Sequence, residues 1–334
     1  TVESCYVDTK GSKRGLTMTE NQIRQRLQHK PVVLALSAFA CLLWGSAYPF
    51  LKISYEMLQL PAGDWGAKVL FAGYRFLLAS LLLFLVTRFG LRQSLKVPTA
   101  LLPWTVVLGL LQTALQYFFF YNGLAYSTGI TGSVIGATGS LFVVIISRMY
   151  YRTDLLTAEK VFGLLVGFAG VVVVNLPKGD IDLSFTFLGE GFLLISSLVG
   201  AFGNIVAKEL AVKAHPFLVT AYQMLFGSML LLLTGSIAAG SGSVVFHWKS
   251  ALMLLYLAFA SATAFAIWYS ILKYNKPGEV AVYRFLVPVW GTLLSALFLR
   301  EAIGLNTLVA LAMVSASIAI VNRREAVRAA LYIL

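Results

Sequence analysis

The sequence predicts an all-α integral membrane protein, with ten transmembrane helices arranged as two inverted repeats of five helices. Composition is the first observation behind this prediction. The 334 residues are 59% hydrophobic and 12% charged, whereas a soluble domain carries about 25% charged residues. The second observation is that the apolar residues fall into runs of span length. The third is that the second half of the chain repeats the first at a constant offset.

The chain begins with a polar and basic tail, residues 1–31, which contains six Lys or Arg and no apolar run. In a signal peptide, a basic region leads directly into a short apolar segment with a small-residue cleavage site. Here the apolar run that follows has full span length, so we do not predict a signal peptide. Met18 precedes the segment TENQIRQRLQ, and we expect residues 1–17 to be upstream or disordered sequence.

Ten apolar runs of roughly 20 to 25 residues follow, and each could cross a hydrocarbon layer about 30 Å thick as a helix. They lie at residues 32–55, 67–88, 101–125, 128–150, 157–176, 187–211, 216–239, 249–273, 277–299 and 302–322. With the N-terminus inside, the inside segments hold 19 Lys or Arg and the outside segments hold 5. Because basic segments stay in the cytoplasm, we expect both termini to be cytoplasmic, including the C-terminal tail at 323–334.

The internal repeat is clearest in residues 278–300, GEVAVYRFLVPVWGTLLSALFLR, which match a segment 148 positions earlier. At this offset Gly136 pairs with Arg284, and residues 72–80, AGYRFLLAS, pair with residues 220–228, TAYQMLFGS. Each unit holds five predicted helices, and an odd number places the second copy upside down in the membrane. Inverted repeats around a site near the midplane are typical of secondary transporters.

The chain resembles the drug/metabolite transporter superfamily, specifically its EamA-type permeases of ten helices. The segments that carry the resemblance are LLWGSAYPFLK at 42–52, AGYRFLLAS at 72–80 and FLVPVWGTLLSALFLREAIG at 285–304. It covers residues 32–176 and 187–322, which we interpret as two EamA-like repeats.

The resemblance implies a multi-pass transporter of the bacterial plasma membrane, commonly an exporter of amino acids, other small metabolites or amphiphilic drugs. It does not specify the substrate. The first repeat departs from the pattern of the second, because Ser140 stands in place of Pro288 and Thr153-Asp154 in place of Glu301. On this evidence the two halves are not expected to be mechanically equivalent.

Polar and aromatic residues near the span centres are the candidates for a substrate site. We predict seven substrate-binding residues: Trp44, Tyr48, Gln112, Gln116, Asn204, Trp268 and Arg284. Trp44 and Tyr48 lie one helical turn apart and form a potential aromatic wall, and Trp44 is too central for a headgroup belt. Gln112 and Gln116 are also one turn apart, and their amides need partners that either a substrate or a neighbouring helix could provide.

Arg284 is the most informative of these candidates. Its guanidinium could hold a carboxylate or phosphate in a bidentate pair. The alternative is that it reaches water or Glu279 at the cytoplasmic end, because helical side chains lean toward the helix N-terminus. Arg75 has the mirrored position on the outer side, where structural pairing is the simpler interpretation. Small residues four apart, such as Gly132 and Gly136, predict close helix packing and give no argument for a homodimer.

Several features are absent from the sequence. No Asp or Glu lies in the middle of a predicted span, so coupling stays open between exchange, facilitated flow and protonation of Glu279. The chain has no GxxxxGK[ST], HExxH or GxSxG sequence, and we expect no cofactor, no metal and no enzymatic activity. Cys5 and Cys41 are the only cysteines, so no disulfide framework is expected. The net charge of +12 lies in short segments between apolar runs, which favours the lipid bilayer over nucleic acid as a partner.

The leading prediction is therefore a secondary transporter that exports a small organic solute by alternating access. One alternative is an exchanger of phosphorylated or nucleotide-linked metabolites, for which further basic residues beside Arg284 would be expected. More distant alternatives are an intramembrane enzyme, which would need a nucleophile and base or a metal cluster at one depth, and a non-transporting scaffold. A scaffold leaves the inverted repeat without a purpose.

Overall fold

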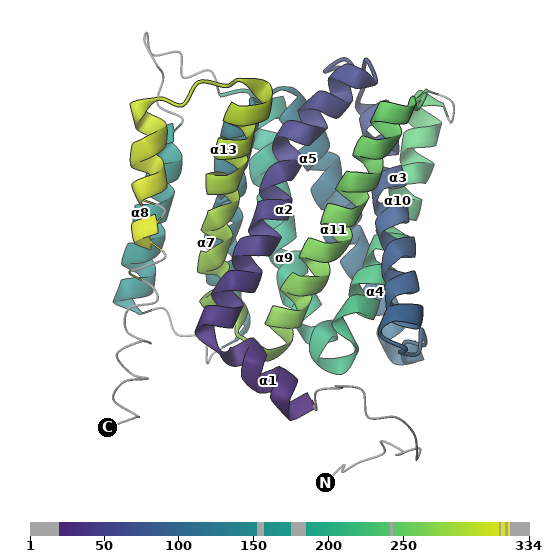
Figure 1. Cartoon of the computed structure of the whole chain (residues 1–334), viewed down its shortest axis with the longest axis vertical. Helices are drawn as coiled ribbons and strands as arrows, with labels where there is room; N and C mark the ends of the chain where they lie inside the picture. Colours follow the sequence, from purple (N-terminus) through teal and green to yellow (C-terminus); the bar gives the residue numbers. More distant parts are fainter. Residues whose placement is uncertain are drawn as a thin grey trace.

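The computed structural model describes residues 20–151, 157–174, 185–240, 243–313, 315–317 and 320. In these ranges every regular element is a helix, and most of the helices run side by side in one bundle (Figure 1). The predictions for residues 1–17 and 323–334, and the comparison that involves Thr153 and Asp154, lie outside the described residues.

Eight helical stretches are long and apolar enough to cross a membrane. Their elements are α2 (Lys30–Met57), α3 (Trp65–Leu85) with η1 (Val86–Gly90), η2 (Thr99–Leu101) with α4 (Leu102–Gly109), η3 (Leu110–Leu115) and α5 (Gln116–Ala125), α6 (Gly129–Gly136) with α7 (Thr138–Tyr150), η4 (Phe187–Gly191) with α9 (Phe192–Lys213), α10 (Pro216–Ala239), α11 (Trp248–Tyr274), and α12 (Pro277–Val280) with η5 (Ala281–Phe285) and α13 (Leu286–Leu299). They coincide with eight of the predicted spans within a few residues.

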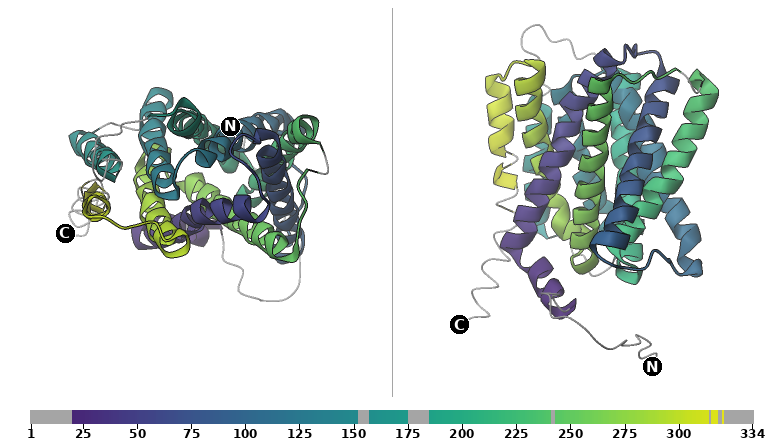
Figure 2. Two further views of the ribbon diagram at one scale, coloured as in Figure 1. Left: turned by 90° about the horizontal axis from the view of Figure 1, so that it is seen from above. Right: turned by 45° about the vertical axis from the view of Figure 1, so that its right-hand side comes forward.

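The fifth and tenth predicted spans are shorter in the described part of the chain. The fifth corresponds to α8 (Ala158–Val174), with 17 residues, and the tenth to a helix at Leu305–Ser317. These two helices lie beside each other at one edge of the bundle (Figures 1 and 2). The count of ten spans and the cytoplasmic position of the termini stay predictions.

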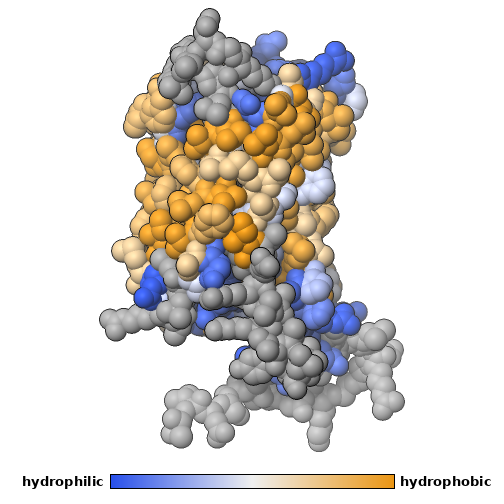
Figure 3. Space-filling model, turned by 90° about the vertical axis from the view of Figure 1, so that its left-hand side faces the viewer, coloured by the Kyte–Doolittle hydropathy of each residue, from blue (hydrophilic) through white to orange (hydrophobic). Residues whose placement is uncertain are grey.

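The surface of the bundle suits a lipid environment. A broad hydrophobic band separates two hydrophilic ends (Figure 3). Apolar side chains project from it, with Leu233 59% and Leu297 70% exposed. Since water would oppose this much exposed apolar surface, the chain is a multi-pass membrane protein.

The helices α3 and α10, which contain the paired segments at 72–80 and 220–228, form the most extensive helix contact. They run antiparallel, because Gly66 faces Ala239 whereas Gly73 faces Leu232. A Cβ atom built on Gly235 would lie 2.6 Å from the backbone nitrogen of Leu70. The glycines therefore permit backbone contact that larger residues would prevent.

Two spans are interrupted at equivalent positions of the repeat. The fourth span breaks at Ala137, between α6 and α7. The ninth has a 3₁₀-helical turn, η5, that ends at Phe285, directly before α13. Ala137 and Phe285 are 148 positions apart, which is the offset of the repeat. Discontinuous helices at corresponding positions of two halves are a feature of transporter binding sites.

The short helix α1 (Glu20–Gln28) forms within the predicted tail and lies across one end of the bundle (Figure 1). It contacts α2 and α11. Glu20 pairs with Lys273 at 3.2 Å, and Asn275 Nδ2 donates to the Leu27 carbonyl at 2.8 Å. We refer to this end, predicted to be cytoplasmic, as the α1 end.

Candidate functional site

A cavity of ≈ 70 Å³ lies among the spans, with walls from α2, α3, η3, α5, α6, α9, α11, η5 and α13. We call it the central cavity. It is lined by all seven of the residues predicted to bind substrate: Trp44, Tyr48, Gln112, Gln116, Asn204, Trp268 and Arg284. The structure thus brings together side chains from six separate segments, and their role in binding stays a prediction.

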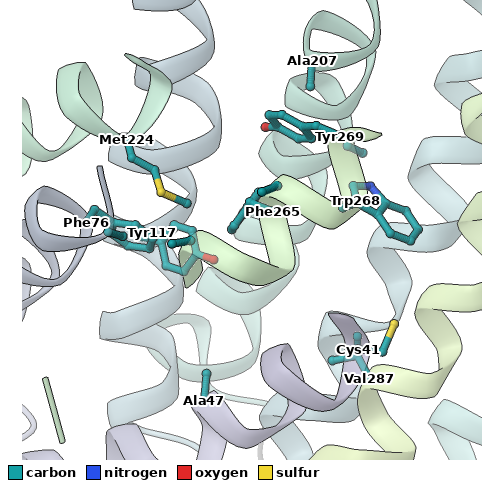
Figure 4. Packing of buried hydrophobic residues seen from close by; sticks show 14 of the residues in the cluster. Cys41, Ala47, Phe76, Tyr117, Ala207, Met224, Phe265, Trp268, Tyr269 and Val287 are labelled. Carbon is teal, nitrogen blue, oxygen red and sulfur yellow. The ribbon is translucent and has the colours of Figure 1, made fainter. Parts of the chain in front are cut away.

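Aromatic rings form much of the cavity wall. The Trp44 ring meets Phe265 and Trp268 edge-on, with centroid distances of 5.2 and 5.5 Å. On another side Tyr48 meets Phe120 at 5.3 Å. Phe265 and Trp268 both project from α11, and Phe265 lies on the side toward Tyr117 of α5 (Figure 4). Edge-on aromatic packing of this kind holds rings in fixed orientations, so the cavity has a rigid apolar surface.

Arg284 brings a positive charge to this aromatic surface. It lies on the 3₁₀ turn η5, with its guanidinium carbon 5.5 Å from the ring centroid of Trp44 and 5.8 Å from that of Trp268. Glu279, which the sequence offered as an alternative partner, pairs with Lys276 at 3.6 Å. The two indole centroids are themselves 5.5 Å apart, so the guanidinium contacts both rings from one side.

The guanidinium of Arg284 forms no hydrogen bond or ion pair with any described residue. A cation–π contact contributes about 0.5–2 kcal/mol, which is less than the cost of removing a charge from water without a counter-ion. A ligand carboxylate or phosphate in the cavity would supply that counter-ion. The site is therefore suited to an anion.

Arg75, by contrast, forms hydrogen bonds within the protein. Its Nε donates to the Leu257 carbonyl at 3.1 Å and to Ser261 Oγ at 2.8 Å, and its Nη1 donates to the Tyr121 hydroxyl at 3.0 Å. The side chain lines the central cavity but is only 1% exposed. These bonds join α3 to α11 and α5, as the structural interpretation of Arg75 requires.

Asn204 orients one of the cavity tryptophans. Its Oδ1 accepts a hydrogen bond from Trp268 Nε1 at 2.8 Å, and its Nδ2 donates to the Gly200 carbonyl at 2.8 Å. These two hydrogen bonds fix the orientation of the Asn204 amide and, through it, that of the Trp268 ring.

The amides of Gln112 and Gln116 have unused hydrogen-bonding capacity. Their Oε1 atoms are buried and find no partner among the described residues, and the same holds for Trp44 Nε1. A buried polar atom without a partner costs roughly 1–3 kcal/mol, so a polar ligand or water would be stabilised here. Gln112 belongs to η3, a π-helical turn within the third span, and such turns are frequent at functional sites.

The sequence prediction missed Tyr117, Ser196 and Ser197, which also line the central cavity. The repeat contains a signal for one of them, because Tyr117 lies 148 positions before Phe265 and both face the cavity. Ser196 and Ser197 resemble ordinary packing residues. Ser196 Oγ donates to the Gln116 carbonyl at 2.8 Å, a contact that only the fold reveals.

The described lining of the central cavity contains two arginines and neither Asp nor Glu. In the same part of the chain, no three His, Cys, Asp or Glu side chains are grouped as a metal site would require. The chemistry of the cavity is thus that of an aromatic, cationic binding site.

Comparison with known proteins places this geometry in a family. The model of the EamA-like transporter family matches residues 31–176 and 187–323. An uncharacterized transporter of Archaeoglobus fulgidus is 28% identical over 269 residues, covering 80% of this chain and 89% of that protein. The uncharacterized transporter YvbV of Bacillus subtilis is 26% identical, covering 87% of this chain and 91% of that protein. A solved crystal structure at 19% identity aligns with a TM-score of 0.68, over 86% of this chain and 96% of its own, and so shares the fold.

Proposed function

The chain belongs to the EamA-like transporter family, and from this membership and the central cavity we propose a specific transport function. The protein is a membrane transporter. The proposal is that it is a secondary transporter of the plasma membrane that exports small organic solutes, amino acids in the first place, by alternating access.

The observation that carries the proposal is the guanidinium of Arg284, which contacts Trp44 and Trp268 but has no described counter-ion. A carboxylate can accept two parallel hydrogen bonds from a guanidinium. The aromatic rings would contact the apolar part of the same solute. The unpaired oxygens of Gln112 and Gln116 are acceptors of the kind that an ammonium group needs. A zwitterionic amino acid combines these three features.

Alternation between two access states follows from the repeat. In the proposed mechanism the two five-helix halves, 32–176 and 187–322, are inverted copies, and their broken spans meet at the cavity. Gly136 and Arg284 occupy equivalent positions in these spans and both line the cavity. Rocking of one half against the other would expose the same site first to one side of the membrane and then to the other.

The test is amino-acid counterflow in proteoliposomes with Arg284→Ala. Loss of a charge-assisted hydrogen bond removes about 1.5–3 kcal/mol, so we expect solute affinity to fall roughly 10- to 150-fold. Arg88→Gln is the matched control, because Arg88 is exposed in η1, outside the central cavity. Unfolding midpoints should confirm that both variants fold. Unchanged counterflow by Arg284→Ala would remove Arg284 from the site.

Exchange of phosphorylated metabolites is the second candidate, since the cavity holds two arginines and no described acid. It is less favoured because Arg75 is already committed to three acceptors. A thermal-shift screen of amino acids against sugar phosphates separates the two candidates, because a ligand that binds only the folded state raises its stability.

A further inference from the structure

A second cavity, of ≈ 390 Å³, opens at the α1 end of the bundle. We call it the vestibule. Its charged and amide side chains come from α1, α2, α9, the turn between α11 and α12, and α12 itself: Gln28, Lys30, Lys208, Asn275, Lys276 and Glu279. It lies apart from the central cavity, and the two share no lining residue in the described chain.

The charge of the vestibule is positive. Three lysines and one glutamate line it, and that glutamate, Glu279, pairs with Lys276 at 3.6 Å. Lys208 is held in place, because its Nζ donates to the carbonyl oxygens of Leu272 and Lys273 at 2.5 and 3.1 Å. An ammonium has three N–H donors, and the third has no partner among the described residues. Lys208 thus presents a fixed cation to a ligand.

A single turn separates the vestibule from the central cavity. Tyr283 lines the vestibule and the next residue, Arg284, lines the central cavity. Both belong to the 3₁₀ turn η5, and the Tyr283 carbonyl accepts a hydrogen bond from Cys41 Sγ at 3.4 Å. A 3₁₀ stretch inside a span often marks a hinge. An anion in the vestibule would therefore lie one turn from the guanidinium of Arg284.

We propose that the vestibule is a second binding site that takes the anionic group, carboxylate or phosphate, of a small solute before it reaches the central cavity. That the bound solute is the transported one rests on the proposed function. The preference for anions rests on Lys208, Lys276 and Lys30 alone. The two claims can therefore fail separately.

The experiment measures the electrostatic potential in the vestibule directly. A cysteine is introduced by Gln28→Cys in a background that also has Cys5→Ser and Cys41→Ala. The protein is placed in neutral phosphatidylcholine nanodiscs. Its rate of modification is measured with an anionic sulfonatoethyl methanethiosulfonate and with the cationic trimethylammonioethyl reagent. A basic vestibule concentrates the anionic reagent.

We expect Lys208→Gln and Lys276→Gln each to slow the anionic reagent about twofold and to accelerate the cationic one by a similar factor. Lys213→Gln, an exposed lysine on the same helix as Lys208, should change neither rate. Lys208→Arg keeps the charge and should keep both rates, which separates a charge effect from a loss of folding. Equal rates in all variants would overturn the proposal.

Protection identifies the ligand. Added glutamate or inorganic phosphate should slow modification in neutral nanodiscs, and Lys208→Gln should weaken that protection. If phosphatidylglycerol nanodiscs alone give the protection and free anions do not, the site holds a lipid headgroup and the solute-binding proposal is wrong. Arg284→Ala should leave the protection intact even where it abolishes transport. Protection that disappears in Arg284→Ala would place the anion in the central cavity instead.

Discussion

Gly203→Ala offers the sharpest test of how the central cavity is built. A Cβ atom at this position of α9 would lie 1.9 Å from Gln112 Oε1, 2.9 Å from its Cδ and 3.2 Å from its Cβ. The amide end can rotate away, but the contact with the Gln112 Cβ atom involves the base of the side chain. Overpacking of this kind costs about 1–3 kcal/mol.

Gln112 also lines the central cavity and its side chain is only 2% exposed, so an amide displaced from Gly203 changes the position of a polar group in the cavity wall. We therefore expect Gly203→Ala to lower the unfolding midpoint and to weaken solute binding about tenfold or more, as one misplaced polar group in a binding site does. Thermal unfolding in detergent and binding to the same preparation measure the two effects.

Gly139→Ala is the matched control. Gly139 also lies on a buried helix, but the nearest atom to its added Cβ, the Ser197 carbonyl oxygen, is 3.6 Å away, an ordinary contact. This variant should be neutral or slightly more stable, because alanine is favoured over glycine in a helix by about 1 kcal/mol. If Gly203→Ala behaves like Gly139→Ala in both assays, the Gln112 amide does not occupy the position described.

Three further predictions concern the structure around the site. Glu301 accepts hydrogen bonds from the backbone N–H groups of Gly129 and Ile130 at 3.0 and 3.1 Å, so Glu301→Ala should destabilise the protein by about 1–2 kcal/mol in thermal unfolding, and Glu301→Gln, which keeps an acceptor, by less. Burial lowers the pKa of His215, and the nearby charge of Lys273 lowers it further. Because the folded state then favours the neutral imidazole, the unfolding midpoint should fall as the pH drops below about 6.5. A His215→Asn variant whose unfolding midpoint falls with pH to the same extent would contradict this. Arg75→Lys replaces the planar guanidinium that bonds to both α11 and α5. This variant should therefore lower the unfolding midpoint by more than Arg284→Lys does.

The ends of most spans follow from helix-starting and helix-ending residues that are visible in the sequence. The predicted span 216–239 is the observed α10, Pro216–Ala239. Pro216 stands in its first turn, where a missing N–H costs nothing. Gly240 follows its end with φ of 83°, a conformation that glycine adopts without strain. Apolar composition and these end signals are enough to predict a span, because a chain segment in lipid has to form all its backbone hydrogen bonds within its own helix.

The breaks within spans could not be read in the same way. Pro288 lies in the first turn of α13, and the irregular turn η5 precedes it. The fourth span breaks at the equivalent position with Ser140 in place of the proline. The break is therefore present in both copies, with or without a proline, and the mechanical difference expected between the halves stays a prediction.

The site residues were predictable as a set but their functions were not. Span-centre position and residue type indicated seven side chains, and these meet in one cavity. Periodicity could not distinguish Asn204, whose carbonyl oxygen accepts a hydrogen bond from Trp268, from Gln112, whose carbonyl oxygen has no described partner. That distinction depends on which helices face each other, and a single sequence does not contain it.

The placement of Arg284 has a consequence for the transport cycle under the proposed function. When the vestibule side is open, water can hydrate the guanidinium. Closing the cavity around it without an anion would bury a lone charge, which is costly, whereas closing it around a carboxylate buries a pair. The same charge that selects the solute would thereby disfavour the empty occluded state. The described lining of the central cavity contains no carboxylate that could serve as this counter-ion, so in the proposed cycle the solute itself is the counter-ion that allows the transporter to change state.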